Sequence, residues 1–429
     1  MLGRRRTLQD PVTIYLDDEP IQAERGEPLA VALLGSNKVT LARSPKLHRP
    51  RAPTCLRGAC DGCLARVDGL PNVMTCLRSA RGGERIETQN VLGSRESDLL
   101  RVTDWFFPQG IDHHHLMAGI PGVSSVMVSF ARKLAGLGTL PDEKVTEQRA
   151  RRAEADVLVV GAGISGHVVA SQLAALGAKV MLVDDGVASG GSLVCAPSVH
   201  KKIADEYTLS SVEKLQGWTA VGIYRREALL ASNESAVVVR PKALVFATGA
   251  HDGVLTVPNN DLPGLFSARA LSHLGARGVF PLGRTAIVGD GFWADELARV
   301  LNENGASDRT VRVPLSSVAG VKGSNRVRAL IVSEGKKSRT VDVDVIGHAA
   351  PSAPSFEVAE QAGANTVFRP GGGYAVACDE QGKCGDGLWA VGECTGLPFE
   401  PDRLIENARS VAKNVAATLT LNTHQPGAE

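Results

Sequence analysis

The sequence of 429 residues predicts an α/β protein with an N-terminal β-grasp domain and two dinucleotide-binding modules of the Rossmann type. Three observations lead to this fold class. Four cysteines cluster in one short segment behind a predicted hairpin and helix. Two glycine-rich turns, at residues 161–166 and 289–294, each separate a predicted strand from a predicted helix. A late strand at 387–392 again ends in glycine, which indicates that the chain returns to the first module.

The β-grasp domain is expected to cover residues 1–92. Residues 12–23 alternate apolar and polar side chains around the turn Asp17–Pro20, which predicts a β-hairpin. Residues 27–35 predict a short helix, and the clustered cysteines follow it. This order of elements places the cysteines on loops at one end of a small sheet.

The four cysteines have the spacing C-x4-C-x2-C-x12-C and are Cys55, Cys60, Cys63 and Cys76. Three thiolates on one loop plus a distant fourth form the plant-type [2Fe–2S] arrangement. We therefore predict a ferredoxin-like domain in which these four residues bind the metal. A structural zinc site and free buried thiols are the alternatives. Zinc sites favour two C-x2-C pairs, and this segment contains only one.

The first glycine-rich turn predicts a cofactor site at the start of a helix. Its glycines allow a pyrophosphate to approach the helix N-terminus, and an acid at the end of the next strand binds the adenosine ribose. The residues expected here are Gly161, Gly163, Ile164, Ser165, Gly166, Asp184 and Asp185. The alternatives are NAD in this site or a turn that holds no ligand.

The far end of this module favours FAD over NAD. The crossover strand ends in Ala247, Thr248 and Gly249, and the return strand ends in Gly392 and Glu393. A carboxylate in the last place can bind the ribityl chain of a flavin, although glutamate here replaces the usual aspartate. We therefore expect a discontinuous FAD-binding domain formed by residues 155–252 and 366–429.

The second module, expected at residues 253–365, repeats the turn as Gly289, Gly291 and Ala294. The following strand, 310–313, does not end in an acid or a pair of arginines that would bind a nucleotide ribose. The sequence thus predicts a partly degraded module. Whether it binds a nucleotide or keeps only the fold stays open.

Between the domains lies an expected connector, residues 93–154, with an apolar stretch and three consecutive histidines, His113 to His115. The stretch can pack within the chain or face a partner. The histidines are expected in an interface or a turn rather than at a metal, because adjacent side chains point in different directions. The remaining cysteines form no C-x2-C or C-x4-C pair and are expected to be buried thiols. They are Cys195, Cys378, Cys384 and Cys394.

The net charge of +1 and a pI of about 7.6 give no support to a nucleic-acid or membrane surface. No apolar run reaches the roughly 18 residues needed for a bilayer span, and the N-terminus lacks the apolar core of a signal peptide. A cytoplasmic location is therefore expected. The sequence contains no motif of a serine hydrolase or a zinc protease.

Residues 40–53 (TLARSPKLHRPRAP) resemble the SRS-x-K-x-HRPRG signature of heteromeric sarcosine oxidase α subunits and their iron–sulfur relatives. These relatives include subunits of D-hydroxyproline dehydrogenase, opine oxidases and hydrogen cyanide synthase. Residues 184–193 are similar to the acidic-residue–GG-x-L segment of this family, which implies that Gly191, Ser192 and Leu193 also contact FAD. The resemblance covers residues 12–415 and does not extend to a folate-binding C-terminal half.

The resemblance implies that an amine is oxidised in a separate β subunit of the D-amino-acid-oxidase-like flavoprotein type, with its own FAD. It also implies that the second module can hold NAD or ATP, and that an FMN can lie at a subunit interface. No catalytic residue can be placed in this chain. We therefore expect an electron-transfer subunit of an oxidoreductase acting on CH–NH donors of the sarcosine, hydroxyproline or opine type. The alternatives are a stand-alone NAD(P)H-dependent flavin reductase with a fused [2Fe–2S] domain and, less favoured, a non-enzymatic scaffold.

Overall fold

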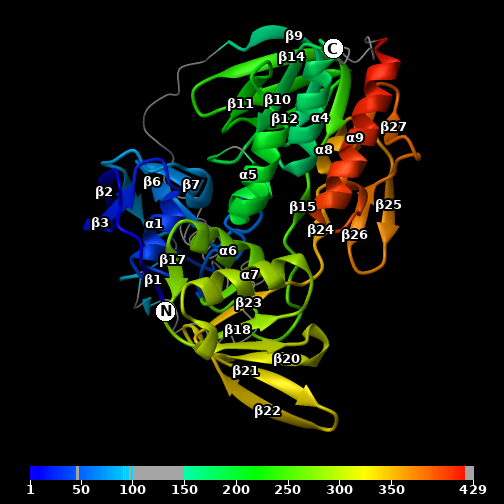
Figure 1. Cartoon of the computed structure of the whole chain (residues 1–429). Helices are drawn as coiled ribbons and strands as arrows, with labels where there is room; N and C mark the ends of the chain where they lie inside the picture. Colours follow the sequence, from blue (N-terminus) through cyan, green and yellow to red (C-terminus); the bar gives the residue numbers. More distant parts are fainter. Residues whose placement is uncertain are drawn as a thin grey trace, which may run out of the picture. The chain divides into compact units, whose positions relative to one another are not determined.

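The computed structural model describes residues 1–44, 48–89, 91, 93–95, 98–99, 149–188 and 190–420. The chain forms two compact units, which are described separately below (Figure 1). Unit 1 comprises Met1–Val145 and Val254–Ala350, and unit 2 comprises Thr146–Gly253 and Pro351–Glu429. None of the helices in the described ranges combines the length and apolar character needed to cross a bilayer.

The first part of unit 1 is a five-stranded β-grasp sheet with the order β3-β2-β8-β6-β7. Its strands are β2 (Pro11–Leu16), β3 (Glu19–Glu24), β6 (Leu64–Val67), β7 (Leu70–Met74) and β8 (Arg85–Glu87). The two hairpins pair antiparallel, and β2 and β8 run parallel between them. Asp17 and Asp18, with φ of 49° and 65°, form the two-residue turn between β2 and β3.

Helix α1 (Leu29–Gly35) covers this sheet. Its six residues from Leu29 to Leu34 are all fully buried, which accounts for a helix with no polar face. Along β2, Ile14 and Leu16 are buried while the residues between them are more exposed, as the alternating pattern predicts. The β-grasp core thus forms from one short apolar helix and the inner face of the sheet.

The second part of unit 1 is a four-stranded parallel sheet with the order β16-β23-β18-β19. The strands are β16 (Leu265–Ser267), β18 (Thr285–Val288), β19 (Thr310–Val313) and β23 (Val345–His348). Helices α6 (Ala268–Ala276) and α7 (Phe292–Glu303) pack against each other and against β23. An antiparallel sheet of β20 (Val318–Gly323), β21 (Val327–Glu334) and β22 (Lys337–Asp342) is inserted between β19 and β23.

The β-grasp domain and the second module are joined by the first residues of the chain. Strand β1 (Leu2–Arg4) pairs antiparallel with β17 (Val279–Pro281) of the second module. The Arg4 guanidinium lies 2.7 Å from the carboxylate of Glu27, whose side chain is 2% exposed. The N-terminal strand therefore ties a buried acid of the β-grasp domain to the second module.

Unit 2 is built on an eight-stranded sheet with the main order β11-β10-β9-β14-β13-β12 and β28 beside β14. Its strands are β9 (Arg151–Val160), β10 (Val180–Asp184), β11 (Glu213–Gln216), β12 (Thr219–Tyr224), β13 (Glu227–Ala231), β14 (Ala236–Phe246), β27 (Lys383–Gly385) and β28 (Leu388–Ala390). Strands β11, β10, β9, β14 and β28 are parallel, whereas β12 and β13 extend β14 as an antiparallel meander.

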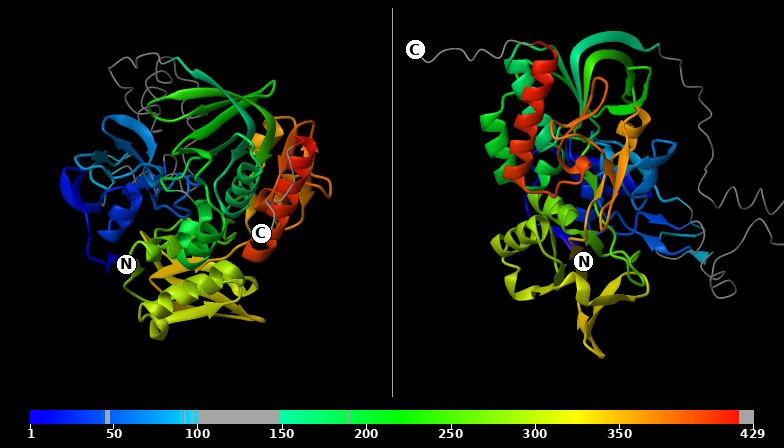
Figure 2. Two further views of the ribbon diagram at one scale, coloured as in Figure 1. Left: turned by 45° about the horizontal axis from the view of Figure 1, so that its top comes forward. Right: turned by 90° about the vertical axis from the view of Figure 1, so that its right-hand side faces the viewer.

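Helices α4 (Ile164–Ala175) and α9 (Pro401–Thr418) lie side by side on one face of this sheet (Figure 2). The interior between them and the sheet is aliphatic, from Val157 on β9 to Val415 on α9. The remaining elements of unit 2 are α5 (Pro197–Glu206), α8 (Glu357–Gln361), and the short strand pairs β15 (Ala250–His251) with β24 (Ala353–Pro354) and β25 (Thr366–Arg369) with β26 (Gly373–Val376).

Two boundaries differ from those expected from the sequence. Strand β9 begins at Arg151, within the expected connector, because its first residues pair with the part of β14 that begins at Val237. The chain enters unit 2 again at Pro351 rather than at residue 366. The residues in between carry α8, whose Ala359 is buried with the strands of unit 2.

Candidate functional site

The four clustered cysteines come together at the end of the β-grasp sheet. Cys55, Cys60 and Cys63 lie on the loop before β6, and Cys76 lies in the single-turn helix η1 (Thr75–Leu77) after β7. The Sγ atoms of Cys55 and Cys60 are 3.4 Å apart, and those of Cys63 and Cys76 are also 3.4 Å apart. Three of the four side chains are buried, and Cys60 is half-buried.

Backbone N–H groups point at these sulfur atoms. The amide of Thr54 lies 3.4 Å from Cys60 Sγ, and that of Arg57 lies 3.4 Å from Cys55 Sγ. Such donors stabilise thiolates and iron-bound sulfur. The loop can take this path only with glycine at position 62, where a Cβ atom would lie 1.9 Å from the carbonyl oxygen of Ala52.

Within each pair, the hydrogen bond lowers the pKa of one thiol and raises the pKa of the other. The Cys55 thiol donates a hydrogen bond to Cys60, which lowers the pKa of Cys60 to about 5 and raises that of Cys55. In the same way the pKa of Cys63 is lowered and that of Cys76 is raised by their mutual hydrogen bond. Each pair therefore holds a proton that iron must displace, because metal ligands are thiolates.

This donor set fits an iron–sulfur cluster: four sulfurs, local backbone donors and a loop with no space for a larger residue. Elsewhere in the described ranges no group of three or more His, Cys, Asp or Glu side chains could hold a metal ion. The ligand roles of the four cysteines stay a prediction, now with a geometry that suits them.

The first glycine-rich turn lies at the carboxyl ends of β9 and β14 in unit 2. A Cβ atom on Gly161 would lie 2.3 Å from the carbonyl oxygen of Ala247, and one on Gly166 would lie 1.8 Å from that of Gly161. These two glycines thus allow close packing of turn, strand and helix. At Gly163, the N-cap of α4, an added Cβ would meet nothing within 4 Å. The space above the N-terminus of α4 is therefore open, as a pyrophosphate requires.

The two expected ribose acids differ in environment. Asp184 accepts hydrogen bonds from the amides of Ala162 and Gly186, at 2.7 and 2.9 Å, and from the side chain of Gln216. Its carboxylate therefore orders the turn. Asp185 is exposed at the end of β10. Of the two, Asp185 is the better placed to reach a ribose.

The other predicted FAD residues surround the same turn. Gly191 passes so close that its Cβ would lie 3.1 Å from the Cα of Gly163. A Cβ on Gly249 would lie 3.8 Å from Oε2 of Glu393, whose side chain is buried. The side chain of Leu193 is fully buried in the core, so only its backbone is available to a ligand. The hydroxyl of Thr248 donates a hydrogen bond to the carbonyl of Ser355, at 2.5 Å.

The second glycine-rich turn has a similar backbone but different charges. Gly291 caps α7 at a φ of 91°, and an added Cβ would meet nothing within 4 Å. Asp295 lies in the first turn of α7, and Asp290 lies within the glycine turn itself. The guanidinium of Arg312 on β19 reaches both carboxylates, at 3.1 Å from Asp290 and 2.7 Å from Asp295.

These carboxylates lie near the electropositive end of α7 and are both paired with Arg312. By contrast, the first turn of α4 contains no acid. The sequence predicted a degraded second module from the missing ribose acid. It did not predict the ion pairs of Arg312, because they join residues 17 to 22 positions apart through the fold.

Two family models match parts of the chain. The family described as a 2Fe-2S iron-sulfur cluster binding domain matches residues 9–91, and the pyridine nucleotide-disulphide oxidoreductase family matches residues 155–314. The α subunit of sarcosine oxidase from Rhizobium meliloti is 27% identical over 411 residues, and an opine oxidase subunit from Agrobacterium tumefaciens is 29% identical over 181 residues. These alignments cover 83% and 36% of this chain.

The chain is thus similar to both subunits over part of their length. The resemblance seen in residues 40–53 is thereby confirmed. The alignments span 41% of the length of the sarcosine oxidase relative and 36% of the length of the opine oxidase relative. The family matches also confirm the [2Fe–2S] cluster and FAD as the cofactors predicted from the sequence.

The fold is shared with a solved structure, that of L-proline dehydrogenase from P. horikoshii. The TM-score is 0.74 at 19% identity, and the match covers 98% of this chain and 76% of the other. The predicted fold class, a β-grasp ferredoxin-like domain with two Rossmann-type modules, is confirmed.

The other predicted candidates are the remaining cysteines and the connector histidines. Cys195 ends η3 (Gly191–Cys195), and Cys394 follows Glu393 with its thiol 3.3 Å from the carbonyl of Phe246. Burial raises the pKa of Cys378 to about 11, of Cys384 to about 12 and of Cys394 to about 11, so these thiols stay protonated near neutral pH. Cys195 is fully buried. These environments suit structural thiols. His113 to His115 and the aromatic part of the connector lie outside the described residues.

Replacing a predicted cluster ligand should remove the cluster but not the flavin. In Cys60→Ser a hydroxyl replaces the thiolate, while the FAD domain in unit 2 is unchanged. We expect loss of most of the bound iron and sulfide, loss of the visible cluster absorption and full flavin content. The control Cys384→Ser, on β27 and partly buried, should keep both cofactors. Stoichiometric zinc in protein produced with adequate iron would contradict the assignment.

Gly163→Val should remove FAD, because its side chain would project into the open space above α4. The helix itself has room for the residue, so the variant should keep its secondary structure by circular dichroism. Gly177→Ala is the control: it lies beyond the other end of α4 at a φ of 86°, where alanine costs about 1 kcal/mol in strain. The control should retain flavin. If the Gly163→Val variant kept its full flavin absorption, the flavin would have to bind at another place in the chain.

Proposed function

We propose that this chain is the electron-transfer subunit of a heteromeric dehydrogenase or oxidase for small amines or imino acids. The observation that carries the proposal is the combination in one chain of a four-cysteine loop suited to [2Fe–2S] and an open FAD-type cradle. FAD accepts electrons in pairs and releases them singly, whereas the cluster accepts one at a time. The chain's own residues bind and orient these groups.

The charges of the FAD-type site support a relay rather than a complete amine oxidase. The ionisable residues assigned to it are Asp184, Asp185 and Glu393, all of them acidic. A substrate such as sarcosine or hydroxyproline carries a carboxylate, which a cationic side chain would have to hold. The residues assigned to the site include no such cation, which favours oxidation of the amine in another subunit.

The relatives support the same assignment, since one is named as the α subunit of sarcosine oxidase and another is named as one of the subunits of opine oxidase. We infer a partner of the D-amino-acid-oxidase-like flavoprotein type that binds the amine on its own FAD. An FMN between the subunits would be consistent with such a complex. A cytoplasmic location is part of this proposal.

The alternative function is a stand-alone flavin reductase that takes electrons from NADH or NADPH. It needs a working nicotinamide nucleotide site in the second module. The carboxylates of Asp290 and Asp295 at the start of α7 oppose a pyrophosphate there. The relay is therefore the better supported function.

Activity should require the partner. The purified chain, loaded with both cofactors, should not oxidise sarcosine, proline, hydroxyproline or opines with an artificial electron acceptor. Co-expression with the flavoprotein encoded next to it should give activity on one of these amines. Turnover by the isolated chain would show that the amine site lies here and that the relay proposal is wrong.

Cys60→Ser provides a control within such a complex. The partner should still oxidise the amine in a single turnover, because its own flavin accepts the hydride. Reduction of the cluster, followed by electron paramagnetic resonance, should be lost. A complex whose steady-state turnover is unaffected by this variant would show that the cluster is not on the electron path.

NADH and NADPH should reduce the bound flavin slowly or not at all. The reason is the acidic start of α7 and the lack of a ribose-binding acid at the end of β19 among the described residues. Anaerobic stopped-flow measurement of flavin absorption checks this, with dithionite as the control that the flavin can be reduced. Rapid stoichiometric bleaching by either nucleotide would favour the reductase.

A further inference from the structure

The segment that carries the family signature meets the cysteine loop at its end, where the carbonyl of Ala52 faces Gly62, but it contains none of the four cysteines and neither glycine turn. Its described parts form a small hairpin in which β4 (Ala42–Arg43) pairs antiparallel with β5 (Pro50–Arg51). Within it the amide of Ser44 donates to the carbonyl of Arg49, and the amide of His48 donates to that of Ser44, both at 2.9 Å. The described part of the signature is therefore held by backbone hydrogen bonds.

Charged contacts fix this hairpin on both sides. Nδ1 of His48 lies 3.3 Å from the carboxylate of Asp98, and the two side chains are 4% and 0% exposed. Arg49 lies 3.8 Å from Asp261 of the second module. The guanidinium of Arg43 donates to the carbonyls of His48, at 3.0 Å, and Arg95, at 2.6 Å. The side chain of Arg43 is consequently held in one position.

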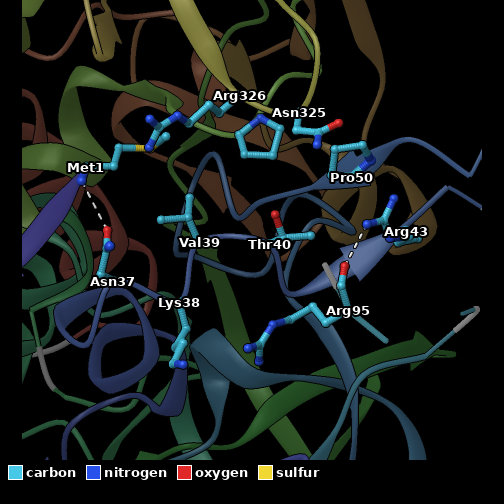
Figure 3. A pocket seen from close by; sticks show the side chains of 11 residues that line it. Met1, Asn37, Lys38, Val39, Thr40, Arg43, Pro50, Arg95, Asn325 and Arg326 are labelled. Carbon is cyan, nitrogen blue, oxygen red and sulfur yellow. Dashed lines mark hydrogen bonds between the residues drawn. The ribbon is translucent and has the colours of Figure 1, made fainter. Parts of the chain in front are cut away.

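Arg43 faces a cavity of about 250 Å³ within unit 1 (Figure 3). One wall comes from the N-terminal part of unit 1, residues 1, 37–40, 43, 50 and 95, and the other from Pro263 and the turn Asn325–Arg326 of the second module. Both walls belong to the same compact unit. The cavity lies apart from the cysteine loop and from both glycine turns, since it shares no residue with them.

Among the described residues, no acidic side chain lines the cavity. Four cationic side chains line it: Lys38, Arg43, Arg95 and Arg326. Arg43 and Arg95 are buried, at 4% and 8% exposed. Lys38 is paired with Glu19 at 2.6 Å, and Arg95 with Asp17 at 3.6 Å, and both acids lie outside the lining.

Arg326 differs from Lys38 and Arg95. It is half-buried, and the described residues place no carboxylate within ion-pair distance of it. Glu19 and Asp17 partly neutralise Lys38 and Arg95. Arg326 therefore adds most directly to the positive potential of a cavity lined in part by the low-dielectric walls of proline and valine. Guanidinium groups in such a place bind oxyanions with paired, charge-assisted hydrogen bonds.

We propose that this cavity is a binding site for a small, multiply charged oxyanion, a phosphate ester or a polycarboxylate. Its volume is below the usual range for whole cofactors, about 300–1,000 Å³, so a dinucleotide is too large. Because the two walls come from different domains of unit 1, the anion joins the β-grasp domain to the second module. The family signature contributes Arg43 and Pro50 to this site and anchors it through His48. This proposal does not depend on the relay function.

Isothermal titration of the full chain, carrying its cofactors, with inorganic pyrophosphate and separately with citrate tests the site. Ionic strength is held constant with potassium chloride, because screening alone weakens such binding. We expect saturable binding at one site per chain and a rise in the melting temperature of unit 1. Arg326→Ala should raise the dissociation constant at least about tenfold, as expected for the loss of one charge-assisted pair.

The matched control is Arg328→Ala, which removes an exposed arginine two residues away on β21 and should leave binding unchanged. Lys38→Ala tests the opposite wall and should also weaken binding, with flavin and iron contents showing that each variant is folded. Binding of pyrophosphate alone assigns a phosphate ester, and binding of citrate alone a polycarboxylate. No saturable binding of either anion, or binding equal in wild type and Arg326→Ala, would overturn the proposal.

Discussion

The structure depends on bringing four cysteine sulfurs into one small loop cluster, where each close pair shares a proton until a metal binds. The loop is confined by backbone contacts, since Gly62 lies against the carbonyl of Ala52 with no space for a side chain. It is also held from outside the β-grasp domain. The amide of Ser267, the N-cap of α6 in the second module, donates to the carbonyl of Thr54, next to Cys55. The cluster loop therefore needs the second module as a support.

This support explains why the second module keeps its fold while its glycine turn carries acids. Strand β1 pairs with β17 of this module, and Arg4 ties β1 to Glu27 of the β-grasp domain. Arg49 lies 3.8 Å from Asp261, so the β-grasp domain meets this module at two places besides the Ser267 contact. A module that positions a redox loop is constrained in its strands and in α6. Its nucleotide-binding turn is not constrained in this way. Asp290 and Asp295 can therefore lie near the position where a pyrophosphate would bind and would repel it.

The sequence predicted what depends on local pattern: the hairpin around Asp17, the buried α1, both glycine turns and the cysteine spacing. It could not predict features that join distant residues. The early start of β9 at Arg151 depends on pairing with β14, about 86 residues later. The cationic cavity combines Lys38 and Arg326, and no motif links them. Sequence alone also could not distinguish Asp184 from Asp185, because their difference lies in hydrogen bonds to the turn.

The two glycine turns show that backbone geometry alone does not decide what a Rossmann-type module binds. At Gly163 and at Gly291 an added Cβ would meet nothing within 4 Å, so both turns leave open space at a helix N-terminus. The difference is electrostatic: α4 begins without an acid, whereas α7 begins with Asp295 beside Asp290. A helix dipole stabilises a carboxylate as readily as a phosphate, so an acid fixed there competes for the same position. Selection for one cofactor in a chain with two such modules thus requires only a change of charge at the second turn.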